Sequence, residues 1–106
     1  MKKFETIKLH DEFDDIIHNG SYKKNQNYII YNKDSKLSFP RFGIAVSKKM
    51  GNAVTRNKVK RQVRMIISNN KNLFKNNKDY IIIVKKSVLD IKYQEMNDSL
   101  KSLIEK

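Results

Sequence analysis

Apolar residues recur along the chain with two periods, one typical of helices and one typical of strands. Spacings of i, i+4, i+7 and i+8 place apolar side chains on one helical face in three segments, 9–18, 53–69 and 93–104. Runs rich in Ile, Val and aromatic residues lie between these segments and are typical of strands. They comprise a short strand early in 21–34, a second around Tyr28–Tyr31, a third at Arg41–Ser47 and a fourth at Tyr80–Lys86. The pattern predicts the element order α-β-β-β-α-β-α.

Turn and cap residues separate these elements. The Asn-Gly pair at 19–20 predicts the end of the first helix, and we expect a loop from Lys33 to Pro40. Gly51 predicts the turn before the second helix, with Asn52 as its N-cap. The run that begins at Tyr80 is continuously apolar, which predicts a strand buried in the centre of the sheet.

Length and composition narrow the class of protein. A chain of 106 residues with 39% hydrophobic residues is expected to fold as one domain spanning 1–106. No apolar run approaches the ~18–20 residues of a membrane span, and the basic start lacks the apolar segment of a signal peptide. We therefore expect a cytoplasmic protein with no membrane partner. The absence of cysteine excludes disulfides, thiolate metal sites and a cysteine nucleophile.

The net charge of +12 is concentrated in one part of the chain. Residues 41–78 carry eleven Lys and Arg and no Asp or Glu, whereas the segments on either side are nearly balanced. A charge that served only solubility would be spread over the whole chain. The concentrated block instead predicts an electrostatic surface for a polyanion.

The centre of this block lies on the predicted second helix, in the stretch GNAVTRNKVKRQVR (51–64). Arg56, Lys60 and Arg64 follow one another at i, i+4 and i+8, so their like charges repel. A phosphate backbone would relieve that repulsion, and arginine forks onto phosphate or a base edge. Two alternatives remain: a solvated face paired with carboxylates of the first helix, and a basic helix on anionic lipid. The lipid alternative is weaker because the narrow apolar stripe of this helix is needed for the core.

The same stretch resembles the signature of the bacterial ribonuclease P protein component. That signature is an alanine, two residues, Arg-Asn, a basic residue, an aliphatic residue, Lys-Arg, one residue, an aliphatic residue and an arginine, matched here from Ala53 to Arg64. The preceding RFGIAVSKKMGNAV, the later DYIIIVKK and the phenylalanine before the HNG turn are also similar to the family. The resemblance covers essentially the whole chain and is highly specific over residues 51–64.

This resemblance implies both a fold and a function. The fold is an α/β (α+β) two-layer sandwich of the ribosomal protein S5 domain 2-like class, with a four-stranded sheet and a left-handed β-α-β crossover around the basic helix. The general rule for parallel crossovers favours the right hand, so the handedness comes from the resemblance alone. The function is that of a subunit of ribonuclease P, an endonuclease that removes the 5′ leader of precursor tRNA. The RNA subunit and its Mg²⁺ carry catalysis there, so we expect no catalytic residue, no metal ligand and no DNA partner.

The resemblance also implies which residues meet each RNA. Those expected to bind the RNA subunit are cationic or polar and lie on or just before the basic helix: Lys48, Lys49, Arg56, Asn57, Lys58, Lys60, Arg61 and Arg64. Those expected to line a cleft for the single-stranded leader are apolar or aromatic: Phe13, Ile17, Ile29 and Tyr31. An aromatic ring there can stack on any base, which suits leaders of varied sequence. Ile17 departs from the family, which often has an aromatic residue at this position, and Phe13 and Tyr31 have a simpler alternative as core residues.

The residues themselves offer no recognisable protein active site. His10 and His18 have no other catalytic group near them in the predicted layout, so surface roles are the simpler explanation. The acids at positions 11, 12, 14 and 15 can be imagined as a Mg²⁺ site, but they are more simply explained by the helix dipole. A stand-alone RNA-binding module and a structural ribosomal protein remain as other classes of function. Neither accounts for the specific run from Ala53 to Arg64.

Overall fold

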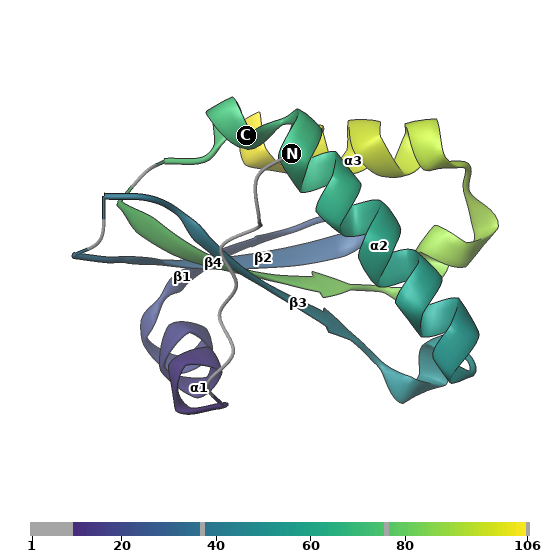
Figure 1. Cartoon of the computed structure of the whole chain (residues 1–106), viewed down its shortest axis with the longest axis horizontal. Helices are drawn as coiled ribbons and strands as arrows, with labels where there is room; N and C mark the ends of the chain where they lie inside the picture. The colour runs from purple at the N-terminus through teal and green to yellow at the C-terminus, as the bar shows by residue number, and fades with distance from the viewer. Residues whose placement is uncertain (1–9, 37, 76, 106) are drawn as a thin grey trace.

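The computed structural model describes residues 10–36, 38–75 and 77–105 (Figure 1). Within these ranges one mixed sheet lies between α-helices on both of its faces, in the predicted order. The elements are α1 (His10–Asn19), β1 (Ser21–Lys24), β2 (Tyr28–Asp34), β3 (Arg41–Val46), α2 (Ala53–Asn69), β4 (Lys78–Val84) and α3 (Tyr93–Glu105). Short 3₁₀ helices occupy three connections: η1 (Lys48–Met50), η2 (Lys71–Leu73) and η3 (Lys86–Asp90).

The sheet has the strand order β1-β2-β4-β3. The β1–β2 and β2–β4 pairs are antiparallel, whereas β3 and β4 are parallel and are joined through α2. In Figure 1, β3 lies in front of β4, both point to the right, and α2 lies above them, which makes this crossover left-handed. The α+β class, the four-stranded sheet and the left-handed crossover implied by the resemblance are therefore confirmed, and α1 adds a helix on the second face of the sheet.

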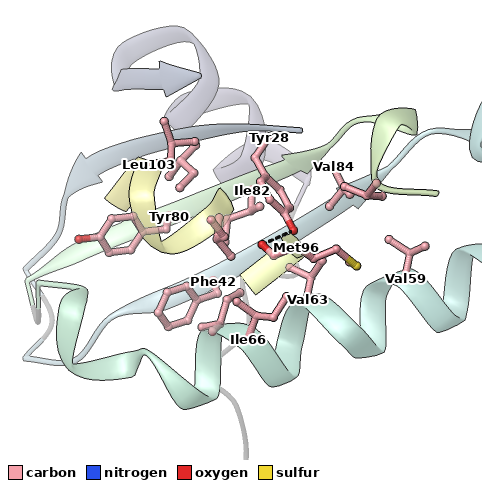
Figure 2. Close-up of a cluster of buried hydrophobic side chains, with 14 of the residues drawn as sticks. Tyr28, Phe42, Val59, Val63, Ile66, Tyr80, Ile82, Val84, Met96 and Leu103 are labelled. Atoms are coloured by element: carbon pink, nitrogen blue, oxygen red, sulfur yellow. Dashed lines mark hydrogen bonds between the residues drawn. The ribbon is translucent and has the colours of Figure 1, made fainter. Parts of the chain in front are cut away.

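The main core lies between the sheet and the two helices α2 and α3 (Figure 2). The predicted apolar stripe of α2 is buried against it: Val59, Val63, Ile66 and Ile67. From β2, the fully buried Tyr28 donates a hydrogen bond from its hydroxyl to the Met96 carbonyl oxygen of α3, at 3.1 Å. Phe42, Phe74 and Tyr80 pack ring against ring, with centroids 4.8 to 5.6 Å apart. These residues belong to one buried hydrophobic cluster.

The start of α2 follows from two adjacent residues. Gly51 has φ of +143°, a conformation that residues with a Cβ rarely adopt. The Oδ1 atom of Asn52 then accepts a hydrogen bond from the Thr55 amide at 3.0 Å, which is the predicted N-cap. The observed bounds of α2, Ala53–Asn69, are the predicted ones.

The bounds of strands β2 and β4 were predicted wrongly. Strand β2 continues through Lys33 and Asp34, where a loop was expected, and β4 begins at Lys78 and ends at Val84, before the expected end at Lys86. The charged residues at this end of the sheet pair in register, with Lys33 opposite Asp79 and Asp34 opposite Lys78. Ion pairs link Lys78 to Asp34 at 3.3 Å and Lys33 to Asp15 of α1. Charge pairing thus supports strand structure where the apolar pattern had ended.

Helix α1 covers part of the other face of the sheet (Figure 1). Ile16 packs on Ile81 of β4, and both are buried, at 2% and 0% exposure. The chain turns after α1 at Gly20, whose amide donates a hydrogen bond to the Ile16 carbonyl oxygen at 2.9 Å. A Cβ at position 20 would overlap that oxygen and the Asn32 carbonyl oxygen of β2, so only glycine fits between the helix and the strand.

Candidate nucleic-acid interface

The polar side of α2 carries a basic surface. This surface points away from the core because the apolar stripe on the other side of the helix is buried there. We call Arg56, Asn57, Lys58, Lys60, Arg61 and Arg64 the α2 basic surface. Four of these residues are exposed, and Arg56 and Lys60 are half-buried. Because the stripe fixes the rotation of the helix against the sheet, the cations are held as an array on one rigid element.

The cations of the α2 basic surface occupy different sides of the helix. Lys58 lines a small cavity between α2 and α3, together with Gln62 and Met96. The row of Arg56, Lys60 and Arg64 lies across the helix from this cavity, at 100° per residue. Since α2 contacts β3 as well as α3, this row faces away from α3, toward the edge strand β3.

No carboxylate of the described residues forms an ion pair with the α2 basic surface. Ion pairs between described residues join Asp15 to Lys33, Asp79 to Arg41, and Asp34 to Lys78. Helix α1, which was considered as a source of compensating acids, lies on the opposite face of the sheet from α2 (Figure 1). The alternative of a solvated face paired with α1 is therefore wrong.

The two lysines before α2 lie on η1, between the end of β3 and the start of the helix. Lys49 is exposed, and its amide donates a hydrogen bond to Ser47 Oγ at 3.1 Å. The side chain of Lys48 lies outside the described residues. Two lysines were predicted to extend the basic surface beyond the N-terminus of α2, and the structure describes the side chain of Lys49 alone.

The residues predicted to line a cleft lie on the face that α1 covers in part. Ile29 and Tyr31 alternate with the core residues of β2, so both point to the α1 side, and Tyr31 packs with Ile17 against the Ile16–Ile81 contact. All three are half-buried, so Tyr31 is neither a sealed core residue nor a freely exposed one. Phe13 belongs to α1 by its backbone, but its side chain lies outside the described residues.

Sequence reasoning missed three residues that extend this surface. Register places Ile83 of β4 beside Ile29 and Ala45 of β3 beside Ile83, and both are half-buried. On the other side, Tyr22 of β1 lies opposite Tyr31, with ring centroids 5.6 Å apart and planes at 40°. We call Ile17, Tyr22, Ile29, Tyr31, Ala45 and Ile83 the α1-side surface. Only the pairing of strands, which no local pattern reveals, brings these residues together.

Charged pairs close one end of the α1-side surface. Asp15 accepts hydrogen bonds from Lys33 and Asn19, and these partners hold the pKa of its carboxyl below the ordinary value. The carboxylate of Asp79 receives two hydrogen bonds from the Arg41 guanidinium, at 2.7 and 3.0 Å. The carboxylates at this end are therefore engaged by cations of the sheet, which leaves the apolar and aromatic side chains as the open part of this face.

The described residues contain no group of three or more His, Asp or Glu side chains placed to hold a metal ion. His18 is exposed, and its Nδ1 atom lies 2.7 Å from the Asp14 carbonyl oxygen, within its own helix. The described helices are too short or too polar to cross a membrane.

Comparison with known proteins identifies the family. The sequence model described as Ribonuclease P matches residues 1–106. The chain belongs to the ribonuclease P protein family. A ribonuclease P protein component of Mycoplasma mycoides is 50% identical over 105 residues, which is 98% of this chain and 96% of the relative. One from Bacillus cereus strain 03BB102 is 38% identical over 101 residues, with coverage of 94% and 88%.

Solved structures of the ribonuclease P family have the same fold. The Staphylococcus aureus RNase P protein at 2.0 Å superposes with a TM-score of 0.88 and 33% identity, covering 97% of this chain and 94% of that one. The Thermotoga maritima RNase P protein gives a TM-score of 0.86 and 26% identity, with 94% of each chain covered. This chain is therefore a protein component of ribonuclease P, a tRNA-processing ribonucleoprotein. Membership in this family excludes the alternatives of a ribosomal protein and of an unrelated RNA-binding module.

Proposed function

We propose that this chain binds the catalytic RNA of ribonuclease P through the α2 basic surface and holds the 5′ leader of precursor tRNA on the α1-side surface. Endonucleolytic removal of the leader is then carried by the RNA, with Mg²⁺ bound mainly by that RNA. The observation that supports this division is the sorting of side chains to the two faces of one sheet. Cations without an ion-pair partner among the described residues lie on the α2 side, and apolar and aromatic groups lie on the α1 side.

The α2 basic surface suits a folded RNA. Each phosphate that a cation neutralises releases condensed counterions, so affinity grows with the number of contacts. Arg56, Arg61 and Arg64 can bind phosphate with two parallel hydrogen bonds, whereas Lys58 and Lys60 act as point charges. Asn57 offers a neutral donor and acceptor for a base edge or a 2′-hydroxyl, which is a contact that DNA lacks. Lys48 and Lys49 extend the cationic surface beyond the start of the helix.

The α1-side surface suits a single strand instead of a duplex. Unpaired bases expose apolar faces that Tyr31 and Ile29 can contact without reading sequence. Ile17, and Phe13 from the same helix, would close the surface on the α1 side. An apolar contact at Ile17 replaces the stacking that an aromatic residue would give there.

The protein lends charge and a leader surface to an active site made of RNA. Because its cations offset phosphate repulsion that Mg²⁺ would otherwise screen, its effect should be greatest when Mg²⁺ is scarce. A cytoplasmic location is part of the same proposal.

The test is cleavage of a precursor tRNA at low Mg²⁺ by the cognate catalytic RNA, with and without this protein. We expect cleavage at the mature 5′ end only when both are present, and none with the protein alone. Equal cleavage by the RNA alone would refute the cofactor role.

The leader contact is tested by Tyr31→Ala, measured as holoenzyme affinity for precursor and for mature tRNA. We expect weaker precursor binding and little change for mature tRNA. The control is Leu89→Ala, which removes a large exposed side chain from η3, an element that contributes no residue to the α1-side surface. Equal losses for the two tRNAs would remove the leader assignment.

A further inference from the structure

Strand β1 is an edge strand of the described sheet, and all four of its side chains are exposed. Its aromatic residue, Tyr22, has 58% of its surface exposed, so the ring contributes little to the core. The ring nevertheless has a defined neighbour, because it lies against Tyr31 at a centroid distance of 5.6 Å. Tyr22 therefore continues the aromatic part of the α1-side surface outward to the sheet edge.

The same face of β1 also carries a cation, Lys24. Side chains alternate along a strand, so Tyr22 and Lys24 share a face, and register places Lys24 opposite Ile29. Lys23 points the other way, into a cavity on the α3 side that Ile30 and Leu103 also line. One face of β1 thus carries an exposed aromatic ring and an exposed cation two residues apart, next to Tyr31 and Ile29.

We propose that Tyr22 and Lys24 form an additional leader subsite, in which Tyr22 stacks on the base of a nucleotide adjacent to the one at Tyr31 and Lys24 neutralises a neighbouring phosphate. This inference rests on the proposed function of the α1-side surface. Aromatic platforms combined with cations along a groove are the recurrent means of holding a single strand without sequence preference. More than half of the surface of Tyr22 is exposed, so a base can reach it without displacing a core residue.

The test uses the reconstituted holoenzyme and a series of precursor tRNAs whose leaders are lengthened one nucleotide at a time. Tyr22→Leu keeps an apolar contact with Tyr31 but removes the ring, and Tyr22→Phe keeps the ring without the hydroxyl. We expect Tyr22→Leu to weaken precursor binding by about 5-fold or more, where 5-fold corresponds to the weakest base stack. This loss should appear only when the leader exceeds a threshold length. We expect Tyr22→Phe to bind like the wild type at every length.

A second readout reports contact directly. A single 4-thiouridine is placed at successive leader positions, and photocrosslinks to residues 21–24 are mapped. We expect crosslinks at one or two adjacent positions, and none once the leader is shorter than the threshold. Lys24→Ala should lower the salt dependence of precursor binding relative to its matched control, Lys101→Ala, an exposed lysine on α3. Equal slopes for these two variants would overturn the role of Lys24.

Two outcomes separate the failure of this inference from the failure of the proposed function. If Tyr31→Ala shows a leader-dependent loss and Tyr22→Leu does not, the Tyr22 subsite is overturned and the leader surface stands. If Tyr31→Ala shows no leader dependence, the leader surface itself fails and the subsite falls with it. A Tyr22→Leu loss that appears with the catalytic RNA in the absence of tRNA would assign Tyr22 to that RNA, which also overturns the subsite.

Discussion

Replacement of Arg61 by alanine is the change on α2 that should alter RNA binding with the least effect on the free energy of unfolding. Arg61 lies two residues from both Val59 and Val63, so at 100° per residue its side chain points about 160° away from each of these buried residues. It is exposed and forms no ion pair among the described residues. We therefore expect the free energy of unfolding to change by no more than about 0.5 kcal/mol. Arg56 is less suitable because its Nε atom is buried.

The expected effect on RNA binding follows from the number of cations on the helix. Five cations that each meet one phosphate give a slope of log K against log salt of about −3.5 to −4.5, and four give about −2.8 to −3.6. Raising the salt from about 50 to 200 mM should thus weaken wild-type binding by roughly 130- to 500-fold, and Arg61→Ala binding by only about 50- to 150-fold.

The assay is fluorescence anisotropy of labelled protein titrated with the cognate catalytic RNA over that salt range. The matched control is Lys101→Ala, which removes one exposed cation from α3 and the same unit of net charge. We expect the control to retain the wild-type slope. It lowers the net charge of the protein, and thus its general attraction to RNA, without removing a contact between a cation and a phosphate. Identical slopes for wild type and Arg61→Ala, or an equal reduction in the control, would refute the docking of α2 on the RNA.

Three further predictions concern the scaffold and are measured by urea unfolding. Asp79→Ala removes both hydrogen bonds to the Arg41 guanidinium at a largely buried site and should cost about 2–3 kcal/mol, and an unchanged midpoint would contradict this. Burial raises the pKa of Tyr28 above its ordinary value of 10.0, so the folded state keeps a proton that the unfolded chain loses. Stability should therefore fall as pH rises above about 10, and less steeply in Tyr28→Phe, which itself costs about 1–2 kcal/mol at neutral pH. Gly20→Ala should destabilise the protein by more than a surface substitution does, because a Cβ would overlap the Asn32 carbonyl oxygen; wild-type stability would show that α1 can shift freely.

The helices were predictable because their period is strong and their ends carry local chemistry. The bounds of α2 follow from the stripe ending in Ile67 and from the Gly51-Asn52 pair, and both signals lie within the segment itself. The ends of β2 and β4 were not predictable in this way. Lys33 and Asp34 are typical of loops, and they become strand residues only because Asp79 and Lys78 stand opposite them.

The α2 basic surface and the α1-side surface also differ in how far the local sequence predicts them. Cations of the α2 basic surface could be predicted because any polar residue opposite a buried stripe must face outward. The α1-side surface draws on every strand of the sheet and on α1, so its membership depends on pairing register. Ile83 looked like one more core residue of a continuous apolar run, and Tyr22 carried no signal until Tyr31 was placed beside it.

The apolar run of β4 explains how one small sheet can carry both of the RNA surfaces proposed above. Ile82 and Val84 face α2 and α3, whereas Ile81 and Ile83 face the other side. Helix α1 seals Ile81 completely but leaves Ile83 half-buried, so the open surface begins where α1 ends. The row of Arg56, Lys60 and Arg64 faces β3, the strand at which the α1-side surface also ends, at Ala45. In the proposed complex the catalytic RNA and the leader therefore lie on opposite faces and approach each other only around β3, with the sheet setting the distance between them.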